Sequence, residues 1–314
     1  MRHNKDRYWI NHLFVVVVMI LWGLNVVALK VLVEYMPPAT MQALRILTAG
    51  AVIALIMTRF QEWRRLTGRE LKYLIFATFL GVVSHHLLLA FGLAHTSAVN
   101  TSLILALVPL TTSVLAMIML GDPFTKFRFF GVILGLAGVF FINIAGKDGQ
   151  IGGLSFGDVA IFLAMFVQAA SFIYVKKATK TIEPRVLTGY MFLLGSFGVF
   201  LFSMWKEPSG LKEVFAVPSF VWLIFFGSAV LATALGHQLF NRSIQKIGPG
   251  ETAVFNNLVP LFGLISSALL LKETVNGGQW LGFIFIVLGV LFGTGYVEER
   301  WRRNHKKDKP TISP

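Results

Sequence analysis

The sequence predicts an all-α membrane protein, on the basis of its composition, its apolar runs and its charge distribution. Of its 314 residues, 55% are hydrophobic and only 14% are charged, whereas soluble domains carry about 25% charged residues. Apolar runs of about 20 residues, the length that spans a bilayer as a helix, follow one another along the chain. Because little sequence lies between these runs, no separate soluble domain is expected.

Ten apolar runs are interpreted as transmembrane helices. They cover roughly residues 12–33, 38–58, 71–92, 97–120, 127–145, 158–177, 185–204, 218–240, 248–271 and 278–296. The first run follows a basic N-terminus, but it is too long for a signal peptide and no small-residue cleavage site follows it. It is therefore expected to be a retained helix. The chain has no cysteine, which excludes disulfides and thiol chemistry.

The positive charge predicts the orientation of the chain. If the ten helices alternate in direction, most of the 28 Lys and Arg residues lie on one side of the membrane. These basic segments are residues 2–7, 59–72, 126–128, 176–185, 242–246 and 300–309. The positive-inside rule then places both termini in the cytoplasm, for a protein of the cytoplasmic (inner) membrane. The net charge of +13 is thus assigned to topology, and no nucleic-acid partner is expected.

The chain contains an internal repeat. The tetrapeptide LVPL occurs at Leu107–Leu110 and again at Leu258–Leu261, a shift of 151 residues. The same shift pairs Thr101 with Thr252, Gly131 with Gly282, Gly138 with Gly289 and His86 with His237. Near the start of each half a shift of 146 fits better and pairs Pro38 with Pro184. The expected units are residues 1–146, residues 147–297 and a basic cytoplasmic tail over 298–314.

The repeat has a consequence for mechanism. Each half holds five predicted helices, and because five is odd the second half enters the membrane upside down relative to the first. Inverted-topology repeats characterise secondary transporters, whose substrate site lies near the bilayer midplane where the halves meet. The sequence therefore predicts two inverted five-helix repeats that work by alternating access.

Prolines and glycines recur at matched positions of the two halves. Pro109 and Pro260 lie near the centres of their runs, where proline removes a backbone N–H and bends the helix. We predict gating kinks there, although isolated prolines are common in membrane helices. Glycines at GxxxG spacing let helices approach closely, so the fifth and tenth helices are predicted to be scaffold. Their glycines are Gly131, Gly135, Gly138, Gly282, Gly289 and Gly293.

Few polar residues lie inside the predicted helices, and such residues usually face protein or water. The candidate cavity residues are Trp22, Asn25, Arg45, His86, Asn100, Gln168, Tyr190, His237 and Asn256. The Arg45 guanidinium suits a substrate carboxylate or phosphate; a structural arginine bonded to loop carbonyls is the open alternative. Trp22 suits stacking on a substrate or simple packing, and His86 suits proton carriage or helix-to-helix hydrogen bonding. Neither a metal nor a cofactor is expected, because the chain lacks cysteine and HxxxH.

Six segments carry a family resemblance. They are LWGLN (21–25), ALRILTAG (43–50), SLILALVPLTT (102–112), GDPFTKFRFFGVILGLAGV (121–139), TAVFNNLVPLFG (252–263) and KETVNGGQWLGFIFIVLGV (272–290). In this order they resemble the ten-span EamA-like branch of the drug/metabolite transporter superfamily over essentially the whole chain. Asp122 departs from the glutamate usual there. The resemblance implies a central cavity lined by helices one to four and six to nine, and export of amino acids or related metabolites.

The predicted function is export of a small metabolite, an amino acid or related compound, by a secondary transporter rather than an enzyme. The expected partners are this solute and the lipid bilayer, for a monomer or a weak homodimer. A multidrug efflux carrier for cations would favour an acidic residue at mid-membrane, and the predicted helices have none there. A membrane-embedded enzyme would need clustered catalytic groups at a membrane face. A sensor or scaffold would not require inverted repeats.

Overall fold

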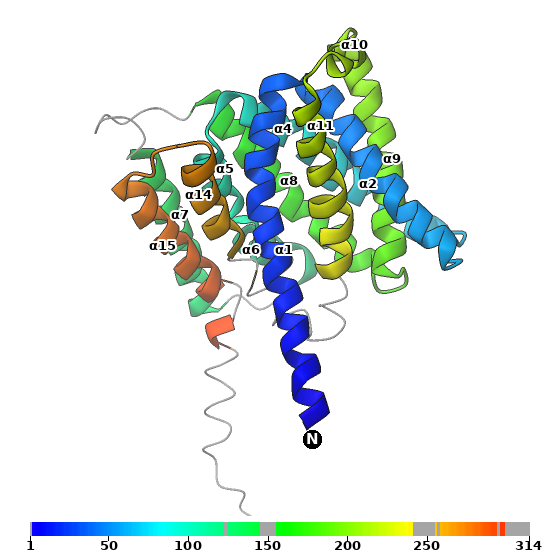
Figure 1. The fold of residues 1–314 in the computed structure, drawn as a ribbon. Coiled ribbons are helices and arrows are strands. Elements are labelled where there is room, and N and C mark those ends of the chain that lie inside the picture. Colours follow the sequence, from blue (N-terminus) through cyan, green and yellow to red (C-terminus); the bar gives the residue numbers. More distant parts are fainter. Residues whose placement is uncertain are drawn as a thin grey trace, which may run out of the picture.

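The computed structural model describes residues 2–121, 125–144, 155–240, 255, 258–293 and 296–298, and these residues form helices and connecting turns. The first half contains α1 (Arg2–Tyr35), α2 (Pro38–Arg59), α3 (Gly68–Thr78), the π-helix η1 (Phe79–Ser84), α4 (His85–His95), α5 (Ala98–Leu105), α6 (Val108–Leu120) and α7 (Lys126–Ile144). The second half contains α8 (Phe156–Ala178), α9 (Pro184–Lys206), α10 (Gly210–Phe215), α11 (Ser219–Phe226), the π-helix η2 (Gly227–Leu235), α14 (Leu258–Leu270) and α15 (Gly277–Gly293). The helices form one bundle, with α10 at one end and the start of α1 extending from the other (Figure 1).

Seven of the described helical segments are long and apolar enough to cross a membrane. They are Leu13–Tyr35, Pro38–Arg59, Gly68–His95, Ala98–Leu120, Phe156–Ala178, Pro184–Lys206 and Ser219–Phe240. α14 and α15 are shorter apolar helices of 13 and 17 residues. Large apolar side chains face outward, with Leu55 71% and Leu223 77% exposed, as a surrounding lipid phase permits. The predicted all-α membrane fold is therefore confirmed, whereas the count of ten and the sides of the termini stay predictions.

The LVPL segment of the first half interrupts a helix. A kinked helix over 97–120 is predicted, and in the structure the segment Ala98–Leu120 consists of α5 and α6, which meet at Ala106 and Leu107. Pro109 lies in the first turn of α6, where a missing N–H removes no intrahelical bond. The proline is therefore accommodated by starting a new helix. Pro260 occupies the third position of α14.

Several local features recur with the spacing of the sequence repeat. Pro38 begins α2 and Pro184 begins α9. A π-helical segment interrupts Gly68–His95 at η1, and another follows α11 as η2. The left-handed residue after α6 is Gly121, with φ of 74°, and its counterpart 151 positions later is Lys272, with φ of 55°. The helix-starting prolines, the π-helical segments and the left-handed residues thus occur at equivalent positions in the two halves.

The glycines of the fifth and tenth predicted helices lie where α7 packs along α15. A Cβ added to Gly131 would stand 2.2 Å from the backbone nitrogen of Gly293 and 2.6 Å from the Gly289 oxygen. A Cβ on Gly138 would stand 2.8 Å from the Gly282 oxygen, and one on Gly135 would meet the side chain of Leu110. The two backbones therefore touch at a distance that only glycine permits.

Two carboxylates cap helices at the α10 end of the bundle. Glu207 accepts the backbone N–H groups of Ala39 and Thr40 at 3.0 and 2.8 Å and the Thr40 hydroxyl at 2.8 Å. Glu273 accepts the N–H groups of Ala98 and Val99 at 3.0 and 2.9 Å. Each carboxylate satisfies the free donors of a helix start and complements its positive dipole end. α2 and α5 are thus anchored by residues distant in the chain.

We expect Glu207→Ala to lower the free energy of unfolding by about 1–2 kcal/mol, because the first turn of α2 loses its cap and charge-assisted bonds. Thermal melting of purified protein in detergent measures this loss. Glu34→Ala is the control, since Glu34 is 54% exposed and only 3.9 Å from Lys30. Equal melting temperatures for the two variants would contradict the capping role.

Candidate functional site

A buried polar cluster surrounds Arg45 in α2, whose side chain is only 1% exposed. Its Nε donates to Gln42 Oε1 at 2.8 Å, and its Nη1 donates to Thr233 Oγ1 at 2.7 Å. Its Nη2 lies 3.1 Å from His86 Nδ1 on α4. A longer contact of 3.5 Å joins Nη1 to Ser228 Oγ. The guanidinium therefore lies where α2, α4 and η2 meet.

The π-helix η2 positions two of these partners. Ser228 and Thr233 are five residues apart, and the Thr233 hydroxyl donates to the Ser228 carbonyl at 2.9 Å. Residues five apart are neighbours in a π-helical turn, and such turns are frequent at functional sites. The local widening of this helix thus turns two hydroxyls toward Arg45.

The cluster extends to α1 and to the helical turn after η2. The Ser228 hydroxyl donates to Asn25 Oδ1 at 2.5 Å, and Trp22 Nε1 donates to the Ala232 carbonyl at 2.9 Å. The Trp22 ring lies 5.1 Å from the ring of His237, whose Nδ1 is 2.7 Å from the Thr233 carbonyl. Five of the predicted cavity residues, Trp22, Asn25, Arg45, His86 and His237, are therefore brought together.

The cluster is rich in hydrogen-bond donors and carries a positive charge. The partners of Arg45 are neutral side chains rather than loop carbonyls. Because a guanidinium has no acceptor atom, His86 accepts at Nδ1 and carries its proton on Nε2. Gln42 is fully buried, and its Nε2 has no partner in the described part of the chain. Such a set of donors fits an anionic group, a carboxylate above all.

Asn100, Gln168 and Tyr190 make no hydrogen bond to this cluster in the described part of the chain. At the α10 end, the Asn100 Nδ2 donates to Asp158 Oδ1 at 3.3 Å and the Asn100 Oδ1 accepts from Gln279 Nε2 at 2.9 Å. Gln168 lies on α8, and its buried Oε1 has no partner among the described residues. Asn256 belongs to the part of the chain outside the described residues.

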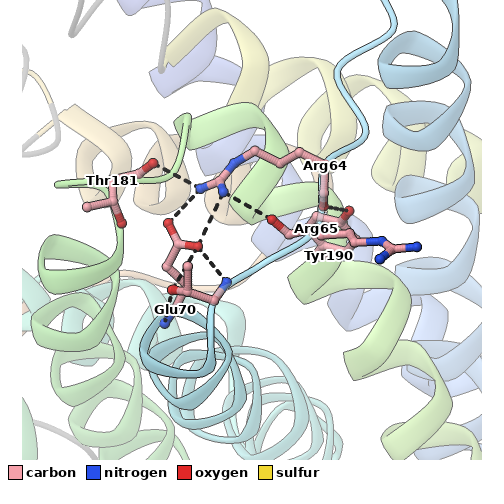
Figure 2. A network of polar contacts seen from close by, with 6 residues as sticks. Arg64, Arg65, Glu70, Thr181 and Tyr190 are labelled. Atoms are coloured by element: carbon pink, nitrogen blue, oxygen red, sulfur yellow. Dashed lines mark hydrogen bonds and ion pairs between the residues drawn. The ribbon is translucent and has the colours of Figure 1, made fainter.

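Tyr190, near the start of α9, lies in a separate network with Arg64, Glu70 and Thr181 (Figure 2). Its hydroxyl donates to the Arg64 carbonyl at 2.8 Å. The Arg64 guanidinium donates to Glu70 at 2.6 Å and to the Thr181 carbonyl at 2.9 Å. Its hydrogen bonds to the Glu70 carboxylate raise the pKa of Arg64. This network joins the loop after α2 to the loop before α9.

A pocket of about 390 Å³ adjoins the Arg45 cluster. It lies between α1, the α11–η2 helix and the end of α14, and two polar residues of the cluster, Asn25 and Ser228, belong to its wall. The other lining residues are Leu21, Leu24, Val27, Ala28, Val31, Ile224, Gly227, Leu231, Ala232, Leu270 and Leu271. Pro109 and Pro260 are outside this lining, so their gating role stays a prediction.

Sequence reasoning missed Gln42, Ser228 and Thr233. Serine and threonine in membrane helices usually bond the carbonyl one turn earlier, as Thr48 does with Leu44 and Thr112 with Val108. Their presence alone therefore gave no signal. The spacing of Gln42 and Arg45, three residues apart on one helix face, was the one available hint.

A buried, donor-rich cluster beside a pocket, inside a bundle of membrane-spanning helices, is the arrangement of a membrane transporter for small molecules. The model of the EamA-like transporter family matches residues 9–144 and 155–294. The chain belongs to this family.

Known proteins similar to this chain are also transporters. The uncharacterized transporter YyaM of Bacillus subtilis (strain 168) is 30% identical over 273 residues, which cover 85% of this chain and 88% of that protein. A probable amino-acid metabolite efflux pump of Salmonella typhimurium (strain LT2) is 25% identical over 281 residues, which cover 87% and 91%. A crystal structure with 17% identity matches 92% of this chain and 98% of the other with a TM-score of 0.67, and so shares the fold.

Proposed function

We infer that this protein is a secondary transporter of the cytoplasmic membrane that exports a small carboxylate-bearing metabolite, an amino acid or related compound. The observation that carries this inference is the buried guanidinium of Arg45, whose partners in the described part of the chain are all neutral. A buried charge without a counter-ion destabilises a fold, so its presence in this position points to a function. The name of the Salmonella relative supports the class of substrate.

Alternating access between two inverted five-helix halves is the proposed mechanism. It is supported by the two matches of one family model to residues 9–144 and 155–294 and by the recurring π-helices and left-handed residues. The pairing of α2 with α9 and of α7 with α15 is what a two-fold axis would produce, because these helices occupy equivalent places in their halves. Ten helices with both termini in the cytoplasm complete the proposal.

The geometry explains how an anion would be held. The contact of Arg45 Nη1 to Ser228, at 3.5 Å, is at the limit of a hydrogen bond, and it is the partner most easily exchanged. A substrate carboxylate entering there would accept a hydrogen bond from the guanidinium in place of the Ser228 hydroxyl. Charge-assisted bonds of this kind are about twice as strong as neutral ones, which favours the exchange.

The alternatives are less well supported. A carrier of cationic drugs would have to bind its substrate beside a buried positive charge, and no Asp or Glu bonds to this cluster in the described part of the chain. An enzyme would need paired catalytic groups within reach of a membrane face, whereas Arg45 and Gln42 are buried. The names of the relatives also favour transport.

The test is exchange in proteoliposomes loaded with unlabelled solute. We expect saturable uptake of at least one labelled amino acid or simple carboxylate, with competition by its unlabelled form and none by quaternary ammonium compounds. Empty liposomes are the control. Uptake of the cations with no uptake of any carboxylate would overturn the proposal in favour of drug efflux.

A further inference from the structure

The pocket beside Arg45 differs sharply in character from the cluster that it adjoins. Eleven of its 13 lining residues are apolar, and its two polar residues, Asn25 and Ser228, are hydrogen-bonded to each other at the boundary with the cluster. Ser228 is also the residue that contacts Arg45 at 3.5 Å. One hydroxyl therefore separates an anion-binding group from an apolar space.

We propose that this pocket holds the apolar side chain of the transported carboxylate, and so favours substrates that carry a longer apolar chain. The inference rests on the proposed function and specifies its substrate. A carboxylate at Arg45 that replaced Ser228 would direct the remainder of the molecule past Ser228 into the pocket. The volume of about 390 Å³ lies in the range of small-molecule sites.

The walls of the pocket explain its selectivity. Ala28 on α1 and Gly227 and Ala232 on η2 keep the space open because they are small, while Leu24 and Leu231 form part of its rim, where they are 38% and 49% exposed. A Cβ added to Gly227 would meet no heavy atom within 4 Å. The fold would therefore accommodate a larger side chain at position 227, and glycine leaves that space to the pocket.

The test is binding affinity along two homologous series, measured by isothermal titration calorimetry on the full-length protein. The first series runs from L-alanine through 2-aminobutyrate and norvaline to norleucine, and the second from propanoate to hexanoate. Each added methylene is expected to strengthen binding about fourfold, because burying one methylene contributes about 0.8 kcal/mol. Arg45→Ala is expected to abolish binding of every member.

Gly227→Leu fills the pocket and is expected to reduce the increase in affinity to less than about 1.5-fold per added methylene. The shortest homologue is expected to bind within about twofold of its affinity for the wild type. Ala28→Leu fills the pocket from α1 and is expected to have the same effect. Because it leaves η2 unchanged, agreement between the two variants excludes a local distortion of η2 as the cause. Gly277→Leu is the matched control, since its Cβ also meets no atom within 4 Å and Gly277 is not among the lining residues. Leu231→Ala enlarges the pocket and is expected to extend the gain to 2-aminoheptanoate.

The outcomes separate the inference from the function on which it rests. Arg45-dependent binding with no dependence on chain length would overturn the pocket and leave the carboxylate carrier intact. Equal weakening of all homologues by Gly227→Leu and Ala28→Leu would also overturn it, because it would show that the variants disturb the shared carboxylate site and not a side-chain pocket. Failure of every homologue to bind the wild-type protein would overturn both.

Discussion

Replacement of Arg45 by methionine is expected to weaken carboxylate binding at least about 30-fold while leaving the fold intact. Loss of one partner from a buried, hydrogen-bonded charge pair costs about 2–5 kcal/mol of binding. In the free protein, however, methionine has a similar volume and relieves the cost of burying a charge, which offsets the hydrogen bonds that Gln42, His86 and Thr233 lose. We therefore expect a melting temperature equal to or above that of the wild type, together with no measurable transport in proteoliposomes.

Arg45→Lys separates charge from geometry in the same assay. A lysine keeps the positive charge but loses the planar pair of donors that suits a carboxylate, so its affinity is expected to lie between those of the wild type and Arg45→Met. Undiminished transport by the methionine variant would remove Arg45 from the binding site. A fall in melting temperature together with intact binding would indicate that the arginine is structural.

Gly131→Leu is expected to destabilise the protein by more than about 3 kcal/mol and to prevent recovery of a monodisperse sample. The first atom of the new side chain would lie 2.2 Å from the backbone nitrogen of Gly293, and a backbone cannot give way as a flexible side chain can. Overpacking that moves side chains alone costs about 1–3 kcal/mol, and here α7 and α15 must separate along their length. Size-exclusion chromatography and thermal melting in detergent measure the loss.

Gly277→Leu is the control for this second prediction. It adds the same side chain to the first turn of α15, where no atom lies within 4 Å of the new Cβ. It is expected to melt close to the wild-type temperature. A Gly131→Leu protein with the same melting temperature as this control would show that the α7–α15 contact contributes little to stability.

Some site residues were predictable because each one is costly in a membrane by itself. Arg45, His86 and Asn25 stand out in apolar runs, and such residues usually face protein or water. Ser228 and Thr233 did not stand out, because their hydroxyls are ordinary in a membrane helix. Only the π-helical turn of η2 and the position of α2 make them partners of Arg45.

The depth and the hydrogen-bond partners of the other polar residues could not be predicted from the sequence either. Asn100 is bonded to Asp158 and Gln279, and Tyr190 to the backbone of Arg64. Each of these bonds joins residues at least 58 positions apart in the chain. A sequence shows that a side chain is polar and near a helix end, but the helix that packs opposite decides what it bonds.

The sequence by itself determined that this protein is an all-α membrane protein, because the requirement to bond every backbone group inside lipid acts on each apolar run separately. The tertiary structure decided which helix faces meet: α7 against α15 through glycine, and α2 against η2 around Arg45. Those choices depend on close packing between segments as much as 188 positions apart, as Arg45 and Thr233 are. Packing of that kind is set by the shapes of both surfaces together, which neither segment reveals alone.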